Sequence, residues 1–157
     1  TDSGLERTVN GMARIERAEI LTTHGEPAAS LPMGAGLRIR LHVRSCADIS
    51  RAGIGTAIFD SQECRVCTLY SVDTTGATFA LRQGERRAFD CLVPQMNLMP
   101  GTYQVNVIVR NETLNKPMDL VPRAISFCVT PGDVYGSGRL PRTSSVVFLP
   151  VNWSQVE

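Results

Sequence analysis

The sequence predicts an all-β fold, an antiparallel sandwich of about eight strands. Apolar and polar residues alternate with a period of two in several segments, most clearly in LRIRLHVRS at residues 37–45. Short apolar runs are separated by turn sequences rich in glycine and proline. No segment repeats its apolar residues with a helical period, which disfavours a parallel sheet with crossover helices.

The strands are expected in order along the chain, each bounded by turn residues. Residues 13–21 come first, followed by residues 37–45, whose apolar positions face the core and whose basic positions face solvent. The remaining expected strands span residues 54–60, 65–70, 86–93, 103–110, 124–129 and 145–151. The turns between strands carry HGEP at 24–27, TG at 75–76, QGE at 83–85, PG at 100–101 and PGD at 131–133.

A local motif at residues 98–103, LMPGTY, refines the fold class. A tyrosine that follows such a turn and opens an alternating strand is typical of the tyrosine corner of immunoglobulin-like sandwiches. In that motif the hydroxyl of the tyrosine, here Tyr103, bonds to backbone a few residues upstream. The expected fold is therefore an immunoglobulin-like antiparallel β-sandwich.

Length and composition limit the chain to one domain and exclude several classes of partner. The 157 residues are 43% apolar and 20% charged, an ordinary globular composition. Residues 1–11 are polar and lack a period, so we expect a linker there and the sandwich at residues 12–157. A net charge of +1 disfavours nucleic acid and anionic lipid as partners. We expect neither a leader nor a membrane span.

The cysteines raise the question of metal or thiol chemistry. Five cysteines, several of them in strand-like runs, favour free thiols in a reducing compartment. The spacing of Cys64 and Cys67 is that of half a zinc site, but a structural zinc needs four ligands and no second such pair is present. His24 lies in a turn and His42 on an outward strand face, with no nucleophile marked beside either. We expect no metal, no cofactor and no catalysis.

Two outward rows of side chains are candidates for ligand binding. Arg38, Arg40 and His42 form a basic row that suits an anion or acidic sugar, although such a row is also typical of a solvated sheet face. On the strand at 103–110, Gln104, Asn106 and Arg110 face outward and suit sugar hydroxyls, with Tyr70 as an aromatic neighbour. Exposed polar decoration is the alternative. The candidate carbohydrate-binding residues are Tyr70, Gln104, Asn106, Arg110, Thr56, Arg38, Arg40 and His42.

Over most of residues 13–153 the sequence resembles the C-terminal carbohydrate-binding domain of the ATP-binding subunit of O-antigen polysaccharide ABC transporters, the Wzt type. The resemblance is carried by ARIERAEILTTHGEP, GIGTAIFDSQECRVCTLYS, LMPGTYQVNVIVRN and the tail from Gly138 to Trp153. Their order and spacing are the signal, since each is degenerate alone. The chain departs from the family at Gln62-Glu63-Cys64, where the family usually has Asp-Gly, and at Leu69-Tyr70-Ser71, where the family often has a small polar Thr-Asn-Thr run.

The resemblance implies a cytoplasmic, non-catalytic domain that recognises the modified non-reducing terminus of a lipid-linked O-antigen polysaccharide before export. It also implies an ATPase domain in the same subunit, joined through residues 1–11, and a membrane-spanning transporter subunit at the inner membrane. A homodimer that exchanges the C-terminal strand 145–151 is implied as well.

Two other functions remain open at this stage. The chain could be a structural or protein-interaction β-sandwich module whose outward rows contact protein. It could also be a small metal- or thiol-dependent enzyme built around Cys64 and Cys67, which would need a bound metal or a thiol of low pKa.

Overall fold

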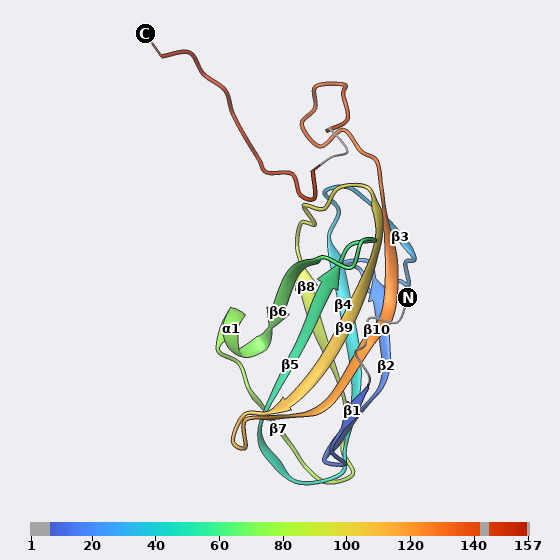
Figure 1. Cartoon of the computed structure of the whole chain (residues 1–157), viewed down its shortest axis with the longest axis vertical. Coiled ribbons are helices and arrows are strands. Elements are labelled where there is room, and N and C mark those ends of the chain that lie inside the picture. The colour runs from blue at the N-terminus through green and yellow to red at the C-terminus, as the bar shows by residue number, and fades with distance from the viewer. Residues whose placement is uncertain (1–6, 142–144, 157) are drawn as a thin grey trace.

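The structure is a computed structural model, and it describes residues 7–141 and 145–156. Two sheets pack face to face, as Figure 1 shows, and their strand pairs are antiparallel except for β3, which runs parallel to β10. The larger sheet has the strand order β1-β10-β9-β5-β6, with β3 added to β10 and β7 added to β5, and the smaller has the order β2-β4-β8. The predicted all-β sandwich is confirmed.

The smaller sheet contains β2 (Ala13–Leu21), β4 (Leu37–Ser45) and β8 (Arg86–Val93). All three begin and end as the sequence predicts. The apolar residues of β4 are at most 2% exposed and alternate with outward basic ones, because successive side chains of a strand point to opposite faces.

The larger sheet is built on two long central strands, β5 (Ile49–Phe59) and β9 (Gly101–Asn111). Its other strands are β1 (Thr8–Val9), β3 (Ser30–Pro32), β6 (Arg65–Tyr70), β7 (Phe79–Leu81) and β10 (Lys116–Thr130). One short helix, α1 (Ser71–Thr75), follows β6 directly. None of the described residues forms a helix that is long and apolar enough to cross a bilayer.

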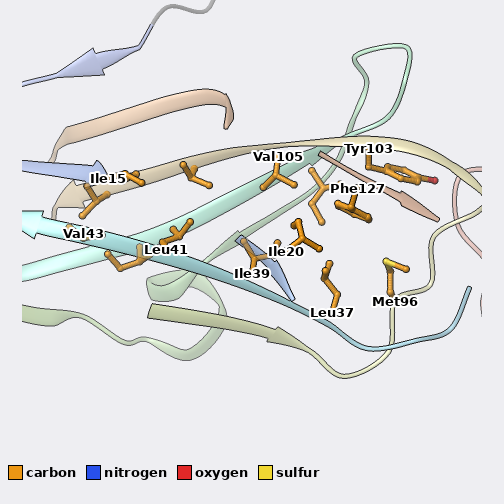
Figure 2. Packing of buried hydrophobic residues seen from close by; sticks show 14 of the residues in the cluster. Ile15, Ile20, Leu37, Ile39, Leu41, Val43, Met96, Tyr103, Val105 and Phe127 are labelled. Carbon is orange, nitrogen blue, oxygen red and sulfur yellow. The ribbon is translucent and has the colours of Figure 1, made fainter. Parts of the chain in front are cut away.

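The core lies between the sheets, where inward residues of β4 meet those of β9 and β10 (Figure 2). The predicted tyrosine corner is confirmed there. Tyr103 Oη donates a hydrogen bond of 2.6 Å to the carbonyl oxygen of Met99, and the ring stacks on Phe127 with 5.5 Å between centroids. This contact fixes the start of β9, so Gln104, Asn106 and Arg110 face outward while Tyr103 stays inside.

The N-terminal segment joins the sandwich from residue 7 onward. Thr8 and Val9 pair with β10, and Arg7 donates hydrogen bonds to both carboxylate oxygens of Asp119, at 3.0 and 2.7 Å. Asp119 is fully buried and also accepts a 2.7 Å hydrogen bond from the amide of Ile15. Part of the expected linker at 1–11 is therefore structured, while residues 1–6 lie outside the described part.

Four of the expected strands differ from the structure, one of them only slightly, since β9 spans Gly101–Asn111 rather than 103–110. Residues 54–60 and 124–129 were predicted too short, because β5 begins at Ile49 and β10 begins at Lys116. The strand predicted at 145–151 is wrong. That segment makes one isolated bridge, Val147 with Leu98, and buries Phe148 before the chain leaves the body (Figure 1). Its apolar alternation is strand-like, but it runs alongside no other strand of the described part.

Candidate functional site

The outer face of the large sheet carries a hollow of about 480 Å³ over β5, β6 and β9. Its floor is β5, where the outward residues Gly55 and Ala57 are both small. Ala57 lies opposite Asn106 on β9, and Gly55 lies opposite Tyr70 on β6. Small residues between two strands with larger side chains leave a groove along β5, which we call the β5 groove.

Tyr70 lies flat across one end of this groove. A Cβ placed on Gly53 would come within 2.0 Å of Tyr70 Oη, and one placed on Gly55 within 2.6 Å of Tyr70 Cδ2. Glycine within a strand often marks such a close approach. The ring thus packs on the β5 backbone and borders the hollow.

Polar side chains hold Tyr70 and the adjacent rim in place. Tyr70 Oη donates a hydrogen bond to Glu112 Oε1. Burial, and then this hydrogen bond, raise the pKa of Tyr70 far above its usual value, so the ring stays neutral. Arg110 Nη2 donates to Asn115 Oδ1 at 3.0 Å, and its Nε lies 3.9 Å from Glu112 Oε1. These contacts fix the Arg110 guanidinium over the groove wall.

Asn106 has a structural role in addition to its place on the wall. β10 carries a bulge between Val121 and Ile125, within which Arg123 has a φ of +49°. The amide of Arg123 donates to Asn106 Oδ1 at 2.9 Å, in place of a ladder bond. The side-chain carbonyl of Asn106 is therefore committed to the bulge, and the residue as a whole is only 8% exposed on the wall of the hollow.

The other end of the β5 groove is marked by Phe59. The Arg65 guanidinium lies 5.2 Å from the centroid of the Phe59 ring and donates to Thr68 Oγ1 at 2.9 Å. Gln104 lies opposite Phe59 on the same outer face. It is one outward position beyond the residues that line the hollow.

Thr56 does not present its hydroxyl to this site. It pairs with the inward-facing Val107, and the residue is only 2% exposed. β5 is buried on both faces, so its sequence carries no apolar alternation from which the direction of Thr56 could be read. Of the candidates, Tyr70, Asn106 and Arg110 are brought together, with Gln104 next to them.

Arg38, Arg40 and His42 lie on the outer face of the other sheet. Arg38 and Arg40 both bind the carboxylate of Asp90, at 2.8 and 2.7 Å. The pKa of Asp90 is lowered to about 2, chiefly by its hydrogen bond with Arg40. His42 Nε2 lies 2.7 Å from Glu19 Oε2, and this contact lowers the pKa of Glu19. The basic row is thus largely neutralised by acidic residues of neighbouring strands.

Several residues of the hollow were missed by sequence reasoning. Glu112, Arg65, Asp73 and Asn115 all border it. They lie in a turn, at a strand start or in α1, where no strand period marks the direction of a side chain. The pattern Gly-x-Gly-x-Ala in β5 was the available signal, because glycine in a strand interior points to a close approach.

The cysteines do not assemble a reactive centre in the described part of the chain. Cys64 lies exposed in the turn before β6, whereas Cys67 is half-buried on β6 and Cys91 on β8. Burial raises the pKa of both the Cys67 and the Cys91 thiols, which is the reverse of activation. Within residues 7–141 and 145–156, no group of three His, Cys, Asp or Glu side chains is placed to hold a metal ion.

The comparisons with known proteins identify the family. The family described as the Wzt C-terminal domain matches residues 5–140. The chain belongs to this family. Among solved structures, the C-terminal domain of Wzt is similar with a TM-score of 0.82 and 16% identity, over 96% of this chain and 88% of that one. None of the curated proteins compared with the chain matches it.

Other solved structures share the fold of this Wzt C-terminal domain more loosely. A Niemann-Pick type C2 protein from Japanese carpenter ant matches with a TM-score of 0.54 and 10% identity, over 80% of this chain and 100% of that one. Pseudomonas fluorescens alkylpurine DNA glycosylase AlkC, bound to DNA containing an abasic site analog, matches with a TM-score of 0.51 and 15% identity. That match covers 76% of this chain and 30% of the glycosylase. At these identities the likeness concerns the fold alone.

Proposed function

We propose that the chain binds the modified non-reducing terminus of a lipid-linked O-antigen polysaccharide for export by an ABC transporter, and that it makes or breaks no bond. The β5 groove carries the proposal. Tyr70 places an aromatic ring there, beside Asn106 and the guanidinium of Arg110. An apolar surface with a few fixed polar groups is the usual design of a small-ligand site.

The charges around the hollow favour a ligand rich in hydroxyl groups over a polyanion. Two basic residues, Arg65 and Arg110, are balanced by two acidic ones, Asp73 and Glu112. No strong field of one sign therefore draws a nucleic acid to this face. Fixed donors and acceptors of both kinds suit sugar hydroxyls, which donate and accept hydrogen bonds.

The length of the groove supports recognition of a chain end. Tyr70 covers β5 at Gly53 and Gly55, and Phe59 with Arg65 occupies the other end. The five residues from Gly55 to Phe59 span only about 13 Å of strand. A short groove with Tyr70 at one end and Phe59 at the other accommodates a terminal sugar and its cap better than the middle of an extended polysaccharide.

The transport context is supported by membership of the Wzt C-terminal domain family. In this proposal the recognition domain is residues 12–157 together with β1, and the chain before β1 connects it to an N-terminal ATPase domain of the same subunit. The ATPase domain and the membrane-spanning subunit would hold the domain at the cytoplasmic side of the inner membrane.

The test is calorimetric titration with the O-antigen polysaccharide of the organism that encodes the chain, with and without its terminal cap. We expect binding of the capped form alone. Arg110→Ala should weaken binding at least about tenfold, since a hydrogen bond to a charged group is lost. The matched control is Arg44→Ala, an exposed arginine on the outer face of the smaller sheet. Equal loss in both variants, or binding of neither polysaccharide, would refute the proposal.

A homodimer that exchanges the C-terminal segment 145–151 is a second part of the proposal. Beyond the buried Phe148, the apolar residues Leu149, Val151 and Trp153 recur at every second position and are 66%, 55% and 94% exposed. A strand-like segment with an uncovered apolar face is suited to a second copy of the chain. Sedimentation should give a dimer for the chain and a monomer after truncation at Phe148. A monomeric intact chain would contradict the exchange.

A further inference from the structure

The sandwich is open along one side, between β8 of the smaller sheet and the β6–α1 segment of the larger. β8 pairs only with β4 and β6 only with β5 among the described strands, so the ladders leave both edges free. A cleft of about 470 Å³ enters the interior there. It lies on the inward side of β5, whereas the β5 groove lies on the outward side.

The cleft is lined mainly by apolar side chains that the protein itself leaves half-covered. Phe89, Cys91 and Val93 on β8 point inward but are only half-buried, whereas the β4 residues opposite them are at most 2% exposed. Phe79 packs against Phe89 with 4.8 Å between ring centroids. Inward apolar residues that remain accessible to solvent lose part of the free energy that burial would supply.

One polar group inside the cleft has no hydrogen-bond partner. Among the lining hydroxyls, Ser71 Oγ donates to the carbonyl of Ala77, and the Thr74 and Thr75 hydroxyls donate to carbonyls four residues earlier, each at 3.0 Å. Thr56 Oγ1 is buried and forms no hydrogen bond with any described residue. The Cys91 thiol lies near Thr56 Oγ1 and interacts with it electrostatically. The two groups do not meet the geometric criteria of a hydrogen bond, and a thiol is a weak hydrogen-bond partner.

The charge of the lining excludes an anionic ligand in the interior. None of the lysines and arginines in the described part of the chain lines the cleft. The carboxylate of Asp90 borders it, and Arg38 and Arg40 already bind that group. A charged head placed beside Thr56 would lose its hydration without gaining a counter-ion.

We propose that this cleft binds a neutral, largely apolar small molecule that carries a hydrogen-bonding oxygen for Thr56 Oγ1. Its volume lies within the range of about 300–1,000 Å³ that small-molecule sites occupy. A buried hydroxyl without a partner is costly, and a ligand oxygen at this point removes the cost. The assignment is independent of glycan binding, because it uses the opposite side of the sheet.

The experiment uses three probes of one shape: 2-naphthol, naphthalene and 2-naphthoate, each displacing the neutral fluorophore N-phenyl-1-naphthylamine at pH 7. We expect 2-naphthol to bind about five- to tenfold more tightly than naphthalene because of its hydrogen bond. The carboxylate 2-naphthoate should bind most weakly. Equal affinity of 2-naphthol and naphthalene, or tightest binding of 2-naphthoate, would overturn the assignment.

Variants locate the preference at Thr56. Thr56→Val keeps the shape of the side chain and should reduce the affinity for 2-naphthol to that for naphthalene. Thr74→Val is the matched control, since its hydroxyl is already bound to backbone, and it should leave the preference intact. Arg110→Ala, on the outward face, should leave all three affinities unchanged. A preference that survives Thr56→Val would contradict the role of this hydroxyl.

A further outcome would assign the cleft to a second copy of the chain. If the C-terminal segment of a partner fills it, the probes bind only after truncation at Phe148. That result would overturn a small-molecule site in the intact protein.

Discussion

The packing of Tyr70 on β5 predicts that the effect of Gly53→Ala on stability changes sign when Tyr70 is removed. Gly53 has no positive φ, so alanine fits its backbone, but the new Cβ would lie 2.0 Å from Tyr70 Oη. In the native chain Gly53→Ala must displace the ring and break its contact with Glu112. We expect a destabilisation of about 1–2 kcal/mol, below the value for a fully buried charged hydrogen bond because the site is partly exposed.

In a Tyr70→Ala background the same substitution meets no ring. Alanine in a strand then has a smaller entropic cost of folding than glycine, so Gly53→Ala should stabilise by about 0.5–1 kcal/mol. The coupling free energy between the two positions is about 2 kcal/mol, within the range for residues in contact.

Urea unfolding of the four proteins, followed by circular dichroism, measures this coupling. Gly132 supplies the control, because its φ is not positive and a Cβ there meets Met33 only at an ordinary 3.6 Å. Gly132→Ala should show no coupling to Tyr70. If Gly53→Ala has the same sign and size in both backgrounds, the ring does not rest on β5 and the groove is not formed as described.

Three further predictions concern the framework around the site. Tyr103→Phe removes a buried hydrogen bond to Met99 and should lower the free energy of unfolding by about 1–2 kcal/mol, measured in urea. Arg7→Met removes the cation that pairs with the fully buried Asp119. It should lower the free energy of unfolding by about 2–3 kcal/mol, a reduced value because the Arg7 side chain is 34% exposed. An unchanged urea midpoint would contradict a stabilising role for this ion pair. Asp90 has a folded-state pKa of about 2, below its unfolded value, so its contribution to stability is present above about pH 4 and is lost as the pH falls towards 2. Asp90→Asn should therefore flatten the fall in stability over that range, and an unaltered pH profile would argue against its pairing with Arg38 and Arg40.

The strands whose side chains alternate were predictable from the sequence, because the period of two is a direct record of one buried and one open face. β2, β4 and β8 begin and end where the pattern places them. β10 was predicted too short, since Pro117, Pro122 and the bulge at Arg123 interrupt its period while its pairing with β9 continues. The segment 145–151 has the apolar alternation of a strand but forms only one isolated bridge with the rest of the described chain. Alternation alone does not show whether a partner strand is present.

The site was predictable only in part, and for the same reason. The direction of Asn106 and Arg110 followed from the inward position of Tyr103 on the same strand. Thr56 was misplaced because β5 is buried on both faces and shows no alternation. The neutralisation of Arg40 could not be foreseen, since its partner Asp90 is 50 residues away and meets it only through the register of β4 with β8.

The most direct test of the central claim is to map the glycan on the domain by NMR. Backbone amide shifts of the ¹⁵N-labelled chain would be followed as the capped O-antigen polysaccharide is added. Glycan binding in the β5 groove predicts that the largest changes cluster at Gly55, Ala57, Thr68 and Arg110. Changes confined to β2, β4 and β8, or none at saturating glycan, would contradict it.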